Sequence, residues 1–377
     1  MTASRKPLAH AVACALGSCM LAPMPAYALM ITTTGVGFSN SATVTDTEGG
    51  EATTNSGSSL GTSSISQFDP NLGVLMGATL NLTSDRTQSV NVASTAGGGT
   101  GANSNVISNG TGSSTVNISA PGVDITYSSL SANDSCADKW KNDCNDGATT
   151  NTDHPSLSGG LGEVPSANLN SYVGISGVTV TRAAPTLEAQ QSNGVFSGTE
   201  STASTLTWSG NVGATYEYLL HADAALSYGD ESGTTLDLDF GTLFLGSAAP
   251  NLDFDIFNVL GERVGLDLDV ISGTGDTNRL TTDLDLFYGL VAGQSNAFIA
   301  SFDTSSAGKF AATYLLTLSD ADAGAAASRR SHTLTLNLAG EVIEGDRVTD
   351  TVPEPASIAL LGLGIAGIGL QRRKTKP

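Results

Sequence analysis

The stretch TTLDLDFGTLFLG, residues 234–246, decides the fold, because apolar residues alternate with aspartates along its first half. Leu236, Leu238 and Phe240 share one side of an extended chain, and the two intervening aspartates share the other, since side chains alternate across a β-strand. The alternation therefore predicts a strand with one buried and one solvated face.

Similar apolar runs, separated by Gly, Asn, Asp or Ser, fill the chain up to residue 342. Seven short antiparallel strands in about 110 residues predict an immunoglobulin-like β-sandwich over residues 234–345, although no Cys-Trp-Cys core is present. The aspartate pairs at 267 and 269 and at 283 and 285 are expected on its solvated face. Carboxylates in cross-strand register could instead chelate Ca²⁺. The further runs are NLDFDIFNV (251–259), VGLDLDVIS (264–272), TDLDLFYGL (282–290), NAFIASFD (296–303), KFAATYLLTLSD (309–320) and SHTLTLNLAGEV (331–342).

The preceding half of the chain is looser, and residues 29–195 are predicted to form a Gly/Ser/Thr-rich β domain. Residues 94–122 are dominated by Gly, Ser, Thr and Asn and are expected to be a long loop or irregular edge, with one strand at 115–120. Residues 196–233 are expected to be a linker with additional strands; the polar stretch 188–204 is the linker between the halves, and the strands are expected in 205–228. The fold class is thus all-β, and further strands are expected at 42–45, 73–82, 89–93, 123–127 and 171–182.

The body of the protein is strongly acidic. The formal net charge is −20. Without the six Lys and Arg near the two ends, ten cations face 35 acidic residues between residues 29 and 353. Such a surface repels phosphate backbones, which excludes nucleic acid as a partner, and it attracts divalent cations or basic partners.

The first 28 residues have the pattern of a secretory signal. A short cationic segment precedes an apolar stretch, and Ala26 and Ala28 form an A-x-A site with cleavage expected after Ala28. A rival interpretation treats Leu16–Cys19 as a lipobox, with Cys19 as the acylated first residue. Either signal implies the Sec machinery as a partner.

The chain ends VPEPASIALLGLGIAGIGLQRRKTKP, residues 352–377. Residues 356–370 are predicted to be a transmembrane helix, although this run is shorter than the roughly 17 to 25 residues that span hydrocarbon comfortably. Arg372, Arg373 and Lys374 would stay cytoplasmic and act as a stop. The tail, reached through a linker at 346–351, is predicted to tether the precursor to the inner membrane transiently.

Val352, Pro353, Glu354 and Pro355, the short apolar segment and the terminal cations resemble a PEP-CTERM sorting signal, a tail also labelled an ice-binding protein C-terminal domain. The resemblance implies that exosortase cuts near Pro353 to Pro355. It also implies transfer to the surface or extracellular matrix of a Gram-negative bacterium that makes exopolysaccharide.

Four stretches of the second half resemble the Ig-like surface domains of the choice-of-anchor D and ASH type. The resemblance implies a cohesive, binding or spacer module. Gln67–Thr83 resembles the opening of choice-of-anchor E domains. The four stretches are LDFGTLFLGS (238–247), IFNVLG (256–261), FIASFDTSSAGKFAATYLLTLSD (298–320) and LTLNLAGEV (334–342).

Cys136 and Cys144 are the only cysteines left after signal removal, and in an exported chain they predict a disulfide. Asp138, Asp143 and Asp146 crowd the same loop and offer oxygen ligands to Ca²⁺, the only cofactor considered. A stapled, solvated loop is the preferred interpretation, because no D-x-D-x-D-G register is met.

No zinc motif, G-x-S-x-G elbow, P-loop or dinucleotide fingerprint occurs, and no enzyme activity is expected. The predicted function is a sorted surface or matrix protein with a structural or adhesive role in exopolysaccharide or biofilm. The alternatives are a carbohydrate-binding or carbohydrate-cleaving protein, for which Trp140, Trp208, Tyr216, Tyr218 and Tyr228 are the candidate aromatic platforms, and a calcium-dependent adhesin.

Overall fold

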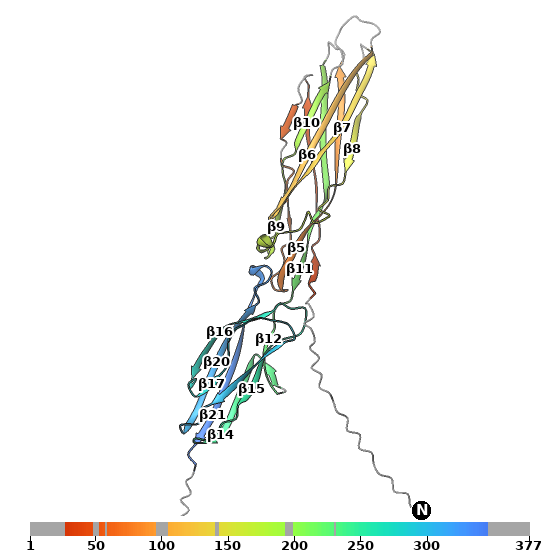
Figure 1. The fold of residues 1–377 in the computed structure, drawn as a ribbon. Coiled ribbons are helices and arrows are strands. Elements are labelled where there is room, and N and C mark those ends of the chain that lie inside the picture. Colours follow the sequence, from red (N-terminus) through yellow and green to blue (C-terminus); the bar gives the residue numbers. More distant parts are fainter. Residues whose placement is uncertain are drawn as a thin grey trace, which may run out of the picture.

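A computed structural model describes residues 27–47, 53–56, 59–95, 105–139, 143–192, 199–229 and 231–345. About two thirds of these residues lie in β-strands, and two short 3-10 helices, η1 (Ser166–Tyr172) and η2 (Ala326–Ser328), lie in connections between strands. The strands build two sandwiches stacked end to end into a rod (Figure 1). The described part of the chain is therefore all-β, as the sequence predicted.

The first sheet of the N-terminal sandwich is built on two long neighbouring strands. The antiparallel ladder between them runs from Thr199 opposite Thr95 to Leu219 opposite Val74. At about 3.3 Å per residue, strands of this length extend for about 70 Å. The strands of this sheet, in spatial order, are β1 (Leu29–Thr32) and β2 (Val36–Asp46) on one edge of β11 (Thr199–Leu219), then β5 (Val74–Thr95) and β8 (Ala148–Asp153).

The second sheet of this sandwich is centred on β6 (Asn105–Ala120). One edge of β6 pairs with β7, and the other pairs with both β10 and β9. The remaining strands of the sheet are β3 (Thr53–Ser56), β4 (Thr62–Ile65), β7 (Val123–Lys139), β9 (Val178–Arg182) and β10 (Thr186–Ser192).

The core of the N-terminal sandwich changes character along the rod. Near the second sandwich it is large and aromatic, with Phe68, Trp208 and Tyr216 buried together with many aliphatic side chains. Toward the far tip the apolar cluster shrinks to Val90, Val92, Ala132 and the two cysteines. The tip is therefore stabilised less by apolar burial than the rest of the sandwich.

Polar side chains fill the space between the sheets in the distal half. Gln88 donates from Nε2 to Ser204 Oγ at 2.8 Å, and Gln191 donates from its backbone N–H to Asp46 Oδ2 at 2.9 Å. Arg86 is fully buried and donates from Nε to Asp153 Oδ1 at 2.9 Å. Burial of these side chains is tolerated because each makes at least one hydrogen bond, although Gln88 Oε1 has no partner among the described residues.

The glycine-rich stretch that sequence reasoning treated as a loop or irregular edge instead contains β6, residues 105–120. Gly110 and Gly112 explain why such a composition forms a central strand. A Cβ at Gly110 would overlap Thr202, and one at Gly112 would overlap Ser204, both on the facing β11. The glycines therefore allow the two sheets to approach closely where the core is thin.

The expected linker is also corrected by the structure. Residues 186–192 form β10, and residues 199–219 form β11, the central strand of the first sheet. Polar residues form strands here because the thin core accepts Gln191, Thr202 and Ser204 beside buried apolar residues of the same strands. The sequence predicted two separate strands at 73–82 and 89–93, whereas the structure has one continuous strand, β5, over this stretch.

The C-terminal sandwich holds two five-stranded sheets over a core of Leu, Ile, Val and Phe side chains. One sheet has the order β13 (Glu231–Gly233), β12 (Ala224–Tyr228), β15 (Leu252–Asn258), β19 (Ser295–Phe302) and β17 (Leu280–Thr282). The other has the order β14 (Thr235–Phe244), β21 (Ser331–Ile343), β20 (Gly308–Asp320), β16 (Leu266–Gly275) and β18 (Phe287–Leu290).

The prediction of an entirely antiparallel sandwich is wrong at one pair. β14 and β21 run parallel, with Leu236 opposite Leu336 and Leu238 opposite Leu338. β14 comes early in the domain and β21 last, so the intervening strands provide the long crossover connection that a parallel pair requires.

The close packing at Gly112 gives the first prediction. Gly112→Ala should lower the free energy of unfolding by about 1 to 3 kcal/mol, because the added methyl group must displace Ser204 and Val90. Urea denaturation followed by circular dichroism measures the effect. Gly37→Ala on β2 is the matched control, since its new Cβ would meet Asn211 Oδ1 at an ordinary 3.4 Å. Equal stability of both variants and the unchanged protein would contradict the close-packing argument.

Candidate functional site

The junction between the two sandwiches brings together a group of titratable side chains, Asp320, His221 and His332. Asp320 ends β20 and is buried, and His221 lies just after β11. His221 Nδ1 is 2.7 Å from Asp320 Oδ2, and His332 Nε2 is 3.4 Å from Asp320 Oδ1. The sequence contains no zinc motif, and no sequence pattern connects these histidines.

The same carboxylate also accepts hydrogen bonds from the backbone. Ala222 N–H donates to Asp320 Oδ1, and Arg330 N–H donates to Asp320 Oδ2, both at 2.8 Å. Burial alone would raise the pKa of Asp320, but the hydrogen bonds from His221, His332 and these two N–H groups hold that pKa well below its usual range. The Asp320 carboxylate thus accepts hydrogen bonds from segments on both sides of the junction.

His221 also contacts the N-terminal sandwich. Its Nε2 is 2.9 Å from the carbonyl oxygen of Pro70, and its Nδ1 faces the Asp320 carboxylate. Because a carbonyl and a carboxylate can only accept, this arrangement is fully satisfied when both ring nitrogens donate, as they do in the imidazolium form. The ion pair of His221 with Asp320 therefore connects the loop before β5 to the end of β20.

Backbone and apolar contacts surround this ion pair. Ala325 N–H donates to Leu75 O at 2.7 Å, and Ser328 Oγ accepts from Leu75 N–H at 3.0 Å. Val74, the first residue of β5, is buried within the core of the C-terminal sandwich. The junction is therefore a packed interface in which the long strand of one sandwich enters the other.

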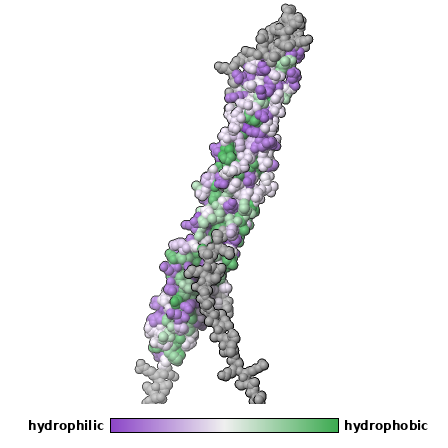
Figure 2. All heavy atoms as spheres, turned by 45° about the vertical axis from the view of Figure 1, so that its right-hand side comes forward, coloured by the Kyte–Doolittle hydropathy of each residue, from purple (hydrophilic) through white to green (hydrophobic). Residues whose placement is uncertain are grey.

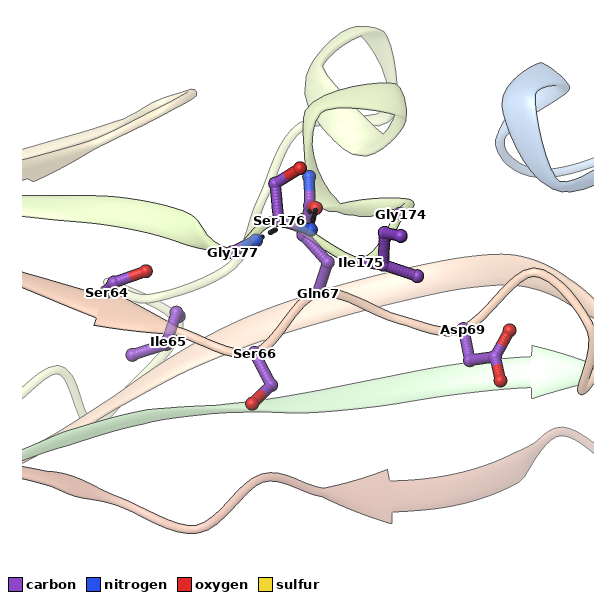
Figure 3. A pocket seen from close by; sticks show the side chains of 9 residues that line it. All are labelled: Ser64, Ile65, Ser66, Gln67, Asp69, Gly174, Ile175, Ser176 and Gly177. Carbon is purple, nitrogen blue, oxygen red and sulfur yellow. Dashed lines mark hydrogen bonds between the residues drawn. The ribbon is translucent and has the colours of Figure 1, made fainter.

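A shallow hollow of about 340 Å³ lies on the N-terminal sandwich, between the segment after β4 and the loop before β9 (Figure 3). Gln67 Oε1 accepts from the N–H groups of Ser176 and Gly177 at 2.9 and 3.0 Å, so the amide holds the loop in place. Asp69 Oδ1 accepts from the N–H of Asn71 at 2.9 Å. The polar groups of the hollow thus serve the local fold, and Ile175 on its rim is 95% exposed.

The far tip holds the cysteine pair. Cys136 on β7 and Cys144 are joined by a disulfide with their Cα atoms 5.9 Å apart. Ser94 on β5 exchanges two backbone hydrogen bonds of 2.9 Å with Cys144. The disulfide therefore connects the two sheets where the apolar core is smallest. Trp140, in the loop between the cysteines, lies outside the described residues.

The calcium hypothesis for the tip gains no support. Asp134 accepts from Val92 N–H at 3.0 Å and from Thr149 Oγ1 at 2.8 Å, and Asn145 Oδ1 accepts from Asn91 Nδ2 at 3.0 Å. Asp138 lies on β7, and Asp143 and Asp146 flank the bridge at Cys144. In the part of the chain that the structure describes, no three His, Cys, Asp or Glu side chains are grouped to hold a metal ion.

The aspartate pairs of the C-terminal sandwich are dispersed. Asp237 and Asp239 on β14 are exposed as predicted, and Asn337 Nδ2 donates to Asp237 Oδ1 at 2.7 Å. β16 is separated from β14 by two strands of the same sheet, β21 and β20, so the pairs are not cross-strand neighbours.

Two further predictions about these aspartates are wrong. Asp267 is buried and accepts from Gly289 N–H at 2.6 Å, because the register of β16 shifts at this point beside β18; burial raises the pKa of Asp267. Asp283 and Asp285 are exposed as expected, but they lie in the connection between β17 and β18 and not in a strand.

The predicted terminal sites fall mostly outside the described residues. This applies to Ala26, to Val352, Pro353, Glu354 and Pro355, to the expected helix at 356–370, and to Arg372, Arg373 and Lys374. Ala28 is described, and β1 begins at the next residue. Among the described residues no helix is long and apolar enough to cross a membrane.

Comparison with protein families identifies the C-terminal segment. Residues 351–374 match the PEP-CTERM protein-sorting motif. The motif supports an exported protein that is processed by exosortase in a membrane-associated sorting step and delivered to the cell surface. A comparison with curated proteins found no match.

The ion pair at the junction gives the second prediction. Asp320→Asn should lower the free energy of unfolding by about 3 kcal/mol at neutral pH, because it leaves a buried imidazolium without its anion. The folded-state pKa of Asp320 lies below the unfolded value of about 3.9, so its contribution is present above pH ~4 and is lost as the pH falls through the folded value. The stability difference between the two proteins should therefore narrow below pH ~4.

Urea titrations over this pH range measure that difference. Asp85→Asn is the matched control, because Asp85 pairs with His154 at 2.6 Å on the exposed surface, where an ion pair contributes little. Equal losses for the two variants would show that the junction pair has no special role.

Proposed function

We propose that this protein is a non-enzymatic surface or matrix protein of a Gram-negative bacterium. Exosortase recognises its C-terminal motif, and its two β-sandwiches act as a rigid spacer with an adhesive role within exopolysaccharide or biofilm. The sorting step rests on the motif at residues 351–374.

The observation that carries the spacer role is the end-to-end arrangement of the sandwiches. The C-terminal sandwich ends at residue 343, a few residues before the sorting motif, and the N-terminal sandwich extends away from it (Figure 1). The ladder of β5 and β11 alone extends for about 70 Å. The tip with Cys136 and Cys144 is therefore held far from the membrane during sorting.

The surface is consistent with this role. Figure 2 shows mostly hydrophilic or weakly polar residues over the outer part of the N-terminal sandwich, and more hydrophobic ones toward the junction and the C-terminal sandwich. Thr43 and Thr205 face each other across β2 and β11 with their Oγ1 atoms 2.9 Å apart, and Thr87 and Thr152 do the same across β5 and β8 at 3.0 Å. Rows of hydroxyl groups offer many weak hydrogen bonds to hydrated polysaccharide. The resemblance to choice-of-anchor and ASH-type domains favours the same kind of module.

The carbohydrate-binding or carbohydrate-cleaving alternative is favoured less. Sugar recognition by stacking needs exposed rings, but Trp208 and Tyr216 are buried and Tyr218 is half-buried. Tyr228 is the exposed member of the described candidates. A calcium-dependent adhesin remains open to a simple test, since chelator should then lower its melting temperature.

The sorting role gives the third prediction. The protein with and without residues 353–377 should be produced in an exosortase-positive host, and cell, matrix and medium fractions compared by immunoblot. The intact chain should reach the matrix or cell surface in a shortened form, and the truncated chain should be lost to the medium. The intact chain in a host without exosortase is the control and should stay cell-associated at full length. Identical fractionation of intact and truncated chains would overturn the proposal.

A further inference from the structure

Three exposed apolar side chains lie together where the described chain ends. Phe244, Leu245 and Ile343 are 59%, 45% and 39% exposed. Phe244 is opposite Ile343 in the parallel pair of β14 and β21, and Leu245 N–H donates to Ile343 O at 2.9 Å. We call these three residues the basal patch, because β14 and β21 end at the extremity of the rod that faces away from the N-terminal sandwich (Figure 1).

A shift in the ladder turns Phe244 outward. Along β14, Leu236, Leu238 and Phe240 are buried, so an unbroken alternation would also bury residue 244. Between Asp239 and Thr242, however, β14 takes one more residue than β21, and Gly241 has a φ of +70°. The extra residue inverts the alternation, so Leu243 packs on the core and Phe244 faces solvent.

The basal patch is also where the chain leads toward the sorting tail. Gly345 is next to Phe244, since a Cβ built on it would lie 3.7 Å from Phe244 Cδ1. The apolar run of the tail begins at residue 356. Eleven residues span at most about 40 Å, which is shorter than the N-terminal sandwich. Once the tail is in the bilayer, the basal patch is the part of the rod held nearest the lipid.

We propose that the basal patch docks on the lipid surface while the sorting tail is still attached. This inference rests on the proposed function, because the tail supplies the attachment. A short tether raises the local concentration of lipid, so a small apolar contact is enough. Phe244, Leu245 and Ile343 would enter the boundary between headgroups and acyl chains. Docking would then hold the rod upright and present the processing motif at a defined height.

The charges around the patch predict which lipids it accepts. Glu344 is exposed, and Glu341 lies 3.8 Å from Lys309 as a weak surface pair. An acidic rim is repelled by anionic headgroups. Docking should therefore be stronger on zwitterionic than on anionic bilayers.

The fourth prediction tests this docking with the full chain reconstituted in nanodiscs. Phe244→Trp places a fluorophore in the basal patch, and the signal of the unsubstituted protein is subtracted. Lipids brominated near the headgroup should quench Phe244→Trp about twofold more strongly than Ile175→Trp, because interfacial apolar groups enter by only ~5–10 Å. Ile175 is the control because it is fully exposed on the N-terminal sandwich. Quenching should weaken when anionic lipid replaces zwitterionic lipid.

Two outcomes would overturn the inference. Equal quenching of Phe244→Trp and Ile175→Trp would show that the patch stays in water. A blue shift of Phe244→Trp without quenching by brominated lipid would show that a second copy or another protein surface covers the patch. Protease protection of the tail in the same discs separates this failure from failure of the proposed function, since an unprotected tail would mean that the sorting segment does not enter the bilayer.

Discussion

The ladder between β5 and β11 is the constraint on which the rest of the structure depends. It runs the whole length of the N-terminal sandwich, and the remaining strands of that sheet pair with one of its two members. Its lower end continues into the second sandwich, where Val74 joins the other core. β5 and β11 form both the N-terminal sandwich and its junction with the C-terminal sandwich. This continuity favours one relative orientation of the two sandwiches.

Contacts at the junction hold the two sandwiches at a defined angle. Asp320 and His221 supply a buried ion pair, and its hydrogen bonds use the carbonyl of Pro70 and the N–H of Ala222. A buried pair is weak support for net stability, but breaking it is costly, so it favours one arrangement over others. The acidic surface also favours an extended arrangement of the two sandwiches, because their like charges repel each other. The same repulsion opposes self-association.

The sequence predicted the class of fold and the sorting tail but not the details of the site. The strict alternation at Leu236, Leu238 and Phe240 correctly predicted a strand and its buried face, because burial of apolar side chains is the main stabilising contribution in this strand. The same logic failed at Asp267, where a register shift beside β18 interrupts the alternation. It also failed at Gly110 and Gly112, because the thin core that requires glycine is a property of the facing sheet. The cluster at Asp320 was invisible because His221 and Ala222 come from a segment about 100 residues before it.

The central claim, that the two sandwiches form one rigid rod, is tested most directly by a distance between them. Spin labels on Thr150→Cys in β8 and Lys309→Cys in β20, two exposed positions, report that distance by pulsed electron resonance. The account predicts a single narrow distance distribution at neutral pH. A broad or multimodal distribution would contradict it, since the sandwiches would then move independently and could not act as a spacer.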